Sequence, residues 1–188
     1  KRRHLLRWRD PEVALSCVME LTEFSEFPVL EWVIRLRNDG AAETAPLAHF
    51  KALDTTWSCA REGEMPELWR ALGSDGRHDD FQPVREELRQ SMWDVARTFR
   101  MDSAANAAFR KARNGSPQFL MADSRPSATW LPFFNLRTGG DGLICALGWS
   151  GQWAAEFAHD GTGRTAISAG MEHLGMQLPP VRDSAGRE

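Results

Sequence analysis

The sequence contains no tyrosine, only three cysteines and no long apolar run among its 188 residues. No stretch is long and apolar enough for a signal peptide or a membrane span, so we expect no membrane partner. The cysteines, Cys17, Cys59 and Cys145, are odd in number and widely spaced, which fits neither a disulfide framework nor a zinc site with paired ligands. Cys17 and Cys145 lie in apolar segments, so we expect buried free thiols and a cytoplasmic rather than a secreted setting.

Excess positive charge is also missing. The formal net charge is -3 and the pI is about 6.0, so no overall positive field exists to hold a phosphate backbone, and we expect no nucleic-acid partner. A short basic stretch opens the chain at residues 1–9, and charge runs of this kind are usually solvated.

The sequence has no recognisable catalytic motif. It lacks a phosphate-binding glycine loop, a His-Glu-x-x-His helix, a nucleophile elbow and a Cys-x-x-Cys pair, and its five histidines are scattered singly. A glycosidase needs only two facing carboxylates, and no such pair can be chosen from 26 acidic residues by sequence alone. We therefore predict no catalytic residue, no cofactor and no metal.

The composition that is present describes an ordinary globular domain. Hydrophobic residues make up 42% and charged residues 26%, and 188 residues suffice for one sizeable core. We expect a single domain over residues 1–188. The chain starts at Lys1 and ends in a polar tail after Leu178, which suggests a piece of a longer polypeptide.

Alternating apolar residues predict a mostly β protein. Residues 13–21 and 30–36 are apolar at every second position, which is the period of a half-buried strand. Further strands are predicted at residues 45–57, 130–136, 143–149, 152–159 and 165–172. These strands predict an antiparallel β-sandwich.

The middle of the chain has a different period. Val84, Leu88, Met92, Val95 and Phe99 recur at helical spacing, which predicts a helix. A short helical segment at residues 66–72 and an alanine-rich one at 104–113 extend this pattern. We therefore expect a helical insertion in the sandwich at about residues 62–125.

The most unusual local pattern is GWSGQW at residues 148–153. A two-residue link at Ser150 and Gly151 is typical of a tight hairpin, which would place Trp149 and Trp153 on adjacent strands. The two indoles then either clamp the sheet or form a platform on which a sugar stacks, and clamping is the commoner role.

A second cluster is HDDF at residues 78–81, on a predicted loop. Loops on rigid scaffolds often carry binding groups, and the carboxylates of Asp79 and Asp80 can bind sugar hydroxyls or weakly hold a cation. A loop rich in Gly and Asp is also simply a common surface connection. No third ligand at a defined spacing supports a metal site.

Read in order, five phrases resemble the amino-terminal domain of family 36 glycoside hydrolases, the α-galactosidase and raffinose-processing group. They are FPVLEWV at 27–33 with NDG at 38–40, ALD at 52–54, GS at 73–74 leading to DFQP at 80–83, LPFFNL at 131–136, and GWSGQW at 148–153. The last is the most specific. The family's usual Pro-Gly-Glu phrase after the sandwich is replaced here by LPPVR at 178–182.

The resemblance implies a β-supersandwich of the galactose-mutarotase-like type, packed against a catalytic (β/α)8 barrel. In that family the two catalytic aspartates belong to the barrel, to which nothing here corresponds, so the isolated chain is predicted to be inactive. The resemblance also implies an α-galactoside or related oligosaccharide as ligand and a homo-oligomer. Loops of such domains approach an active site, which makes Asp79, Asp80 and Trp57 candidates for lining a sugar subsite.

The sequence leaves two alternative functions open. One is a stand-alone carbohydrate-binding module that uses Trp149 and Trp153 as stacking platforms. The other is a mutarotase-like epimerase, which needs convergent His and Glu side chains for acid–base chemistry and finds only the loosely spaced His159 and His173.

Overall fold

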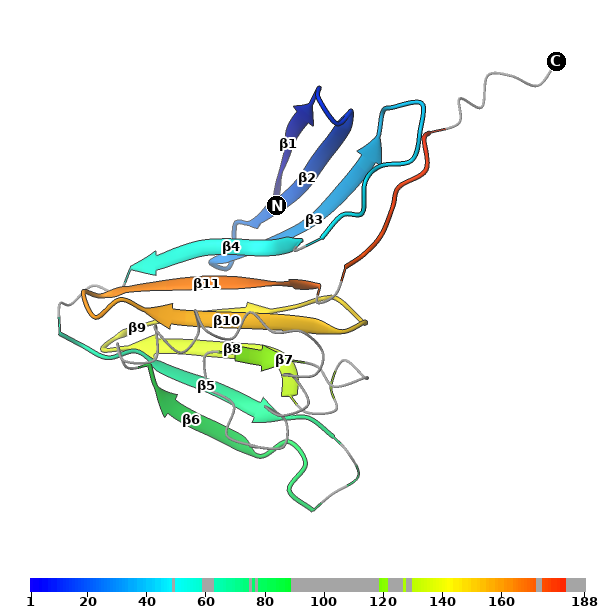
Figure 1. Cartoon of the computed structure of the whole chain (residues 1–188). Coiled ribbons are helices and arrows are strands. Elements are labelled where there is room, and N and C mark those ends of the chain that lie inside the picture. Colours follow the sequence, from blue (N-terminus) through cyan, green and yellow to red (C-terminus); the bar gives the residue numbers. More distant parts are fainter. Residues whose placement is uncertain are drawn as a thin grey trace. The chain divides into compact units, whose positions relative to one another are not determined.

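The computed structural model describes residues 1–48, 50–58, 63–74, 76, 78–88, 119–121, 127, 130–171 and 174–181. The chain divides into two compact units, one formed by residues 1–48 and 174–188 and the other by residues 49–173 (Figure 1). The expectation of a single domain over the whole chain stays a prediction.

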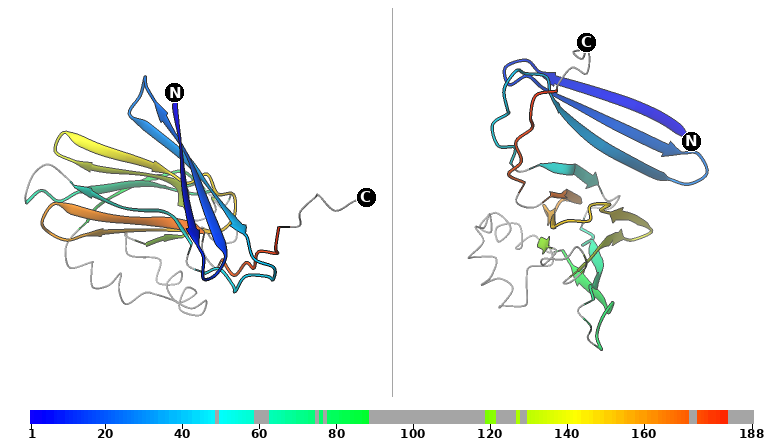
Figure 2. Two further views of the ribbon diagram at one scale, coloured as in Figure 1. Left: turned by 90° about the horizontal axis from the view of Figure 1, so that it is seen from above. Right: turned by 90° about the vertical axis from the view of Figure 1, so that its right-hand side faces the viewer.

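The first unit is built on a three-stranded antiparallel sheet in the order β1-β2-β3. Its strands are β1 (Arg2–Asp10), β2 (Leu15–Phe24) and β3 (Val29–Asn38), drawn in blue in Figures 1 and 2. The register aligns Leu6 with Met19 and Met19 with Ile34. The strands predicted at residues 13–21 and 30–36 are confirmed, because their alternating apolar side chains fall on one face of this sheet.

Asn38 joins the end of this sheet to the C-terminal segment of the same unit. Its side chain is 2% exposed and donates hydrogen bonds to the carbonyl oxygens of Ala42 (2.7 Å) and Leu178 (2.8 Å). The backbone N–H of Leu47 donates to the carbonyl of Met176 at 2.9 Å. Residues 174–181 are therefore held by backbone pairing that the sequence pattern did not predict.

The second unit is a β-sandwich of two four-stranded antiparallel sheets. One has the order β4-β11-β10-β7, formed by β4 (Lys51–Ser58), β11 (Arg164–Met171), β10 (Trp153–His159) and β7 (Phe119–Met121). The other has the order β6-β5-β8-β9, formed by β6 (Pro83–Glu87), β5 (Glu67–Leu72), β8 (Trp130–Thr138) and β9 (Asp141–Ala146).

Aromatic side chains link the two sheets of the sandwich. Phe134 of β8 contacts Trp153 and Phe157 of β10 edge to face, with ring centroids 5.8 Å and 5.1 Å apart. All three are buried, with aliphatic residues of β5, β8, β10 and β11 around them. The predicted mostly β sandwich is thus confirmed, and its core lies between these two sheets.

The predicted helical insertion is wrong wherever the structure describes it. Residues 67–72 form β5 and residues 83–87 form β6, and the described part of the chain contains no helix. Val84 and Leu88 are four residues apart, a spacing that puts side chains on one face of a strand as well as of a helix. The positions from 89 to 118, including Met92, Val95 and Phe99, lie outside the described residues. Consequently no helix of the described part is long and apolar enough to cross a membrane.

The tight hairpin predicted at Ser150 and Gly151 is also wrong. β9 pairs with β8, whereas β10 pairs with β11 and β7, so residues 147–152 pass from one sheet to the other. A Gly-containing link between two apolar segments fits a tight hairpin and also a connection between two sheets, because both need a sharp bend. The predicted pairing of residues 152–159 with 165–172 is confirmed as the β10–β11 hairpin.

A buried cation lies on the inner side of β5. Arg70 is 7% exposed, its Nη2 donates to Glu86 at 2.8 Å, and its guanidinium lies 4.4 Å from the centroid of the Trp130 ring. Its Nε and Nη1 have no acceptor within the described ranges. Burial lowers the pKa of Arg70, and the hydrogen bond to Glu86 opposes that effect.

Candidate functional site

The two tryptophans of residues 148–153 have opposite environments. Trp153 is completely buried in the sandwich core, so its predicted role as a sugar platform is wrong and it clamps the two sheets instead. Trp149 is 44% exposed and lies against Gly151, where a Cβ atom would be only 2.6 Å from the indole Nε1. The pair therefore does not form one surface.

Trp57 and the Asp79–Asp80 loop take up structural positions. Trp57 of β4 is half-buried and packs against the core. Asp80 accepts hydrogen bonds from the hydroxyl of Ser74 (2.8 Å) and the N–H of Gly76 (3.1 Å), which organises the loop between β5 and β6. The N–H of Gln82 donates to the carbonyl of Asp79 at 3.3 Å. Asp79 and Asp80 lie together in the loop between β5 and β6, whereas Trp57 lies on β4 of the other sheet. The role of all three at a sugar subsite stays a prediction.

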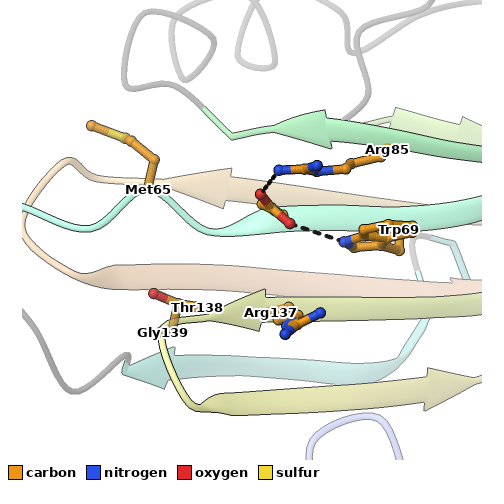
Figure 3. Close-up of a pocket in the computed structure, with 7 residues that line it drawn as sticks. Met65, Trp69, Arg85, Arg137, Thr138 and Gly139 are labelled. Carbon is orange, nitrogen blue, oxygen red and sulfur yellow. Dashed lines mark hydrogen bonds and ion pairs between the residues drawn. The ribbon is translucent and has the colours of Figure 1, made fainter.

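A polar surface lies on the outer face of the β6-β5-β8-β9 sheet (Figure 3). The register places Arg85 and Asn135 on either side of Trp69, and Arg137 beside Glu67. These outward-facing side chains alternate with the inward-facing Leu68 and Arg70 along β5. The shallow depression here, which we name the Trp69 surface, is lined by Met65, Glu67, Trp69, Arg85, Arg137, Thr138 and Gly139.

Hydrogen bonds connect the three central residues of the Trp69 surface. The Trp69 Nε1–H donates to Glu67 at 3.1 Å and the Arg85 guanidinium donates to the other carboxylate oxygen, as the dashed lines in Figure 3 mark. Arg85 also lies 5.5 Å from the centroid of the Trp69 ring. The hydrogen bonds from Arg85 and Trp69 lower the pKa of Glu67, so this carboxylate stays ionised at neutral pH and is a poor general acid.

The Trp69 surface can therefore bind hydroxyl-bearing ligands better than it can transform them. A half-buried indole offers an apolar patch, and its neighbours offer a carboxylate acceptor and guanidinium donors. The sequence pattern does not reveal this surface, because a helix over residues 66–72 would place Glu67, Trp69 and Arg85 at unrelated positions, whereas the strand β5 brings them together. The sequence signal covers β5 alone, where Leu68 and Leu72 alternate with Glu67, Trp69 and Ala71; that Arg85 joins them follows from the β5–β6 register.

Metal-binding and acid–base groups are the other features that chemistry would need in the described part of the chain. No group of three or more His, Cys, Asp or Glu side chains that could hold a metal is found there. His159 is 2% exposed and its Nδ1 lies 3.2 Å from the hydroxyl of Thr165, which is a structural contact within the β10–β11 hairpin. His173, the other histidine considered for an epimerase, lies outside the described residues.

Known protein-family patterns do not match this sequence, and neither does any curated protein. Solved structures do match its fold, which is that of a β-sandwich region found within much larger glycoside hydrolases. Against the GH36 α-galactosidase AgaA from Geobacillus stearothermophilus, the similarity covers 95% of this chain and 22% of that chain, with a TM-score of 0.64 and 16% identity. Against the galactosidase domain of the α-galactosidase-sucrose kinase AgaSK it covers 96% and 22%, with a TM-score of 0.63 and 13% identity.

A variant of AgaA in complex with 1-deoxygalactonojirimycin gives a similar result, with a TM-score of 0.63 at 15% identity. This chain thus spans about a fifth of the length of the enzymes that it matches, since 22% of those chains is covered. The fold expected from the resemblance to family 36 enzymes is confirmed. At these identities the likeness concerns the fold.

Proposed function

We propose that this chain is the non-catalytic β-sandwich region of an α-galactosidase-like glycoside hydrolase. In this proposal a catalytic (β/α)8 barrel outside residues 1–188 carries out the hydrolysis, and the sandwich supports its active site and its oligomer contacts. The observation that carries the proposal is the fold match, because 95% of this chain corresponds to 22% of enzymes whose names state α-galactosidase activity.

Two carboxylates of the described residues, those of Glu67 and Asp80, are poorly suited to the role of general acid. Retaining glycosidases need two carboxyl groups about 5 Å apart, one of which must be protonated. The Glu67 carboxylate is instead held ionised by Arg85 and Trp69. Asp80 is engaged in the hydrogen bonds of its own loop.

The proposal predicts the activity of the product of the complete reading frame, which would contain both residues 1–188 and the barrel. That product is expected to hydrolyse an aryl α-galactoside, and deletion of residues 1–188 is expected to lower kcat/KM by at least about tenfold, because the barrel loses its supporting surface. Steady-state kinetics measures the effect, with thermal unfolding of both proteins to separate lost support from lost folding. A complete product without glycosidase activity, or a deletion that changes nothing, contradicts the proposal.

A stand-alone carbohydrate-binding role is the second candidate, and the Trp69 surface favours it. The indole of Trp69 lies on an outer sheet face, next to Glu67 and the donors of Arg85. Sugars combine apolar C–H faces with hydroxyl groups, which is the chemistry that these side chains complement. Trp153 takes no part in this candidate because it is buried.

Calorimetry distinguishes the two roles. If the Trp69 surface binds galactosides, titration of the isolated chain gives a measurable affinity that falls at least about tenfold in Trp69→Ala, as expected for the loss of one stacked ring. Trp149→Ala is the matched control, because Trp149 is 44% exposed but lies outside this surface. Absence of binding, or equal losses in both variants, rejects the carbohydrate-binding role.

A further inference from the structure

β1 is an edge strand whose side chains are exposed on both faces of its sheet. It lies at one edge of the order β1-β2-β3 and pairs with β2 alone among the described strands (Figure 1). Eight of its nine residues are exposed, and the remaining one, His4, is half-buried. Even its large apolar side chains are exposed, by 54% at Leu5, 38% at Leu6 and 51% at Trp8. The strand is therefore accessible along its length.

The outer edge of β1 offers backbone hydrogen-bonding groups to a further strand. In an antiparallel pair, every second residue of an edge strand directs its N–H and C=O groups away from its partner. β1 pairs with β2 in one continuous register, from Arg2 with Glu23 to Asp10 with Leu15, and no proline interrupts it. Bulges, prolines and short strands are the usual means of closing an edge, so β1 is guarded by its charges alone.

Those charges are almost all positive. Asp10, the one acidic residue of β1, accepts hydrogen bonds from the backbone N–H groups of Glu12 and Val13 in the turn to β2. The other charged residues of the strand are four arginines, of which Arg3 and Arg7 form no ion pair within the described residues. The edge therefore carries an excess of positive charge. Because successive side chains alternate, one side of the strand, which we name the cationic side, carries Arg3, Leu5, Arg7 and Arg9, and the other carries Arg2, His4, Leu6 and Trp8.

We propose that β1 binds an extended segment of another protein as an additional strand of its sheet. This partner segment has an acidic residue at every second position and apolar residues between them. Cross-strand neighbours lie about 5 Å apart, so its acidic side chains lie opposite Arg3 and Arg7, and its apolar side chains lie opposite Leu6 and Trp8. Backbone hydrogen bonds supply the affinity and the alternation supplies the specificity. The proposal goes beyond the function proposed above and does not depend on it.

Other occupants fit this edge less well. Antiparallel pairing of β1 with a second copy about Leu5 places Arg3 opposite Arg7 twice, and pairing about Leu6 places Arg3 opposite Arg9 twice. Like charges directly opposite each other destabilise a pair of strands. A single-stranded nucleic acid supplies negative charge, but its sugar–phosphate backbone cannot continue the ladder of peptide hydrogen bonds. An acidic and apolar strand satisfies both the charges and the backbone.

Calorimetric titration of the chain with a capped nine-residue peptide of alternating glutamate and valine tests the proposal, over about 1 to about 500 µM peptide. Binding is expected. A peptide of the same composition with its glutamates in one block is expected to bind at least about tenfold more weakly, because its acidic side chains no longer share one side of the strand. Two further isomers are N-methylated on alternate sets of backbone nitrogens. Their affinities are expected to differ at least about tenfold, because one set faces β1 and the other faces away.

Two variants of the chain locate the binding edge. Arg7→Glu is expected to raise the Kd of the alternating peptide at least about tenfold, because it replaces an attraction to the added strand by a repulsion. Arg35→Glu is the matched control. Arg35 lies in the same row as Arg7 and on the same face of the sheet, but on β3 at the opposite edge, and its side chain is 64% exposed. This variant is expected to leave the Kd within about threefold, and circular dichroism checks that both variants keep their sheet content.

Hydrogen exchange provides a readout that attraction between charges alone would not move. The alternating peptide is expected to slow the exchange of every second amide of residues 2–10, those that face the open edge. Absence of binding, unchanged exchange, equal losses in both variants, or equally tight binding of the blocked peptide or of a single-stranded oligonucleotide overturns the proposal. Protection of these amides that rises with chain concentration without peptide also overturns it, because β1 then pairs with its own copy. None of these outcomes bears on the hydrolase proposal.

Discussion

Trp153→Ala is expected to destabilise the sandwich by about 3–5 kcal/mol, the usual cost of removing a buried tryptophan. The indole is completely buried and meets Phe134 edge to face at 5.8 Å, so its removal opens a cavity at the point where the two sheets contact each other. Urea unfolding followed by circular dichroism measures the change. A domain of ordinary stability would lose a large part of its free energy of unfolding.

Trp149→Ala is the control, since it changes the same residue type four positions earlier. Trp149 is 44% exposed, and its removal is expected to cost less than about 1 kcal/mol. Equal losses in the two variants would mean that residues 148–153 act as one clamp, as a hairpin would, and that their crossing between the sheets is wrong.

The second large effect is expected for Glu86→Ala, at about 3 kcal/mol, because it removes the carboxylate that neutralises a buried guanidinium. The Arg70 side chain is 4% exposed and its Nη2 lies 2.8 Å from Glu86. Arg70→Met removes the charge together with its need for a partner, so it is expected to change stability by less than about 1 kcal/mol. The double variant should then resemble Arg70→Met.

An exposed ion pair serves as the control for this cycle. Arg35 and Glu20 lie 3.2 Å apart with side chains 64% and 49% exposed, so Glu20→Ala is expected to cost less than about 1 kcal/mol. Urea unfolding of the four variants and the wild-type chain gives the comparison. A Glu86→Ala variant as stable as Glu20→Ala would show that Arg70 does not depend on Glu86.

The sequence predicted the strands well where one face meets apolar surroundings and the other meets water. Residues 13–21 and 30–36 alternate regularly, and both became strands of the first sheet. The prediction failed where two periods coincide: Val84 and Leu88 fit a helix and a strand equally, and long-range pairing with β5 decides for the strand. Only tertiary pairing, which local pattern does not contain, separates these cases.

The candidate site was predicted less well than the fold. The pattern at residues 148–153 points to two tryptophans. The burial of each indole, however, depends on which sheet its neighbouring strand joins, and the local sequence does not contain that topology. The Trp69 surface needs Glu67, Trp69 and Arg85 to meet across two paired strands, 18 residues apart in the case of Glu67 and Arg85. Such a meeting becomes visible only once the β5–β6 register is known.

The central claim is that this sandwich supports chemistry performed elsewhere in a polypeptide. Its most direct test is prolonged incubation of purified residues 1–188, at high concentration, with an aryl α-galactoside and with raffinose, followed by release of the aryl group and of free galactose. We predict no release above that of the buffer alone. Sustained turnover by this chain, lost in a variant of one of its own carboxylates, would contradict the claim.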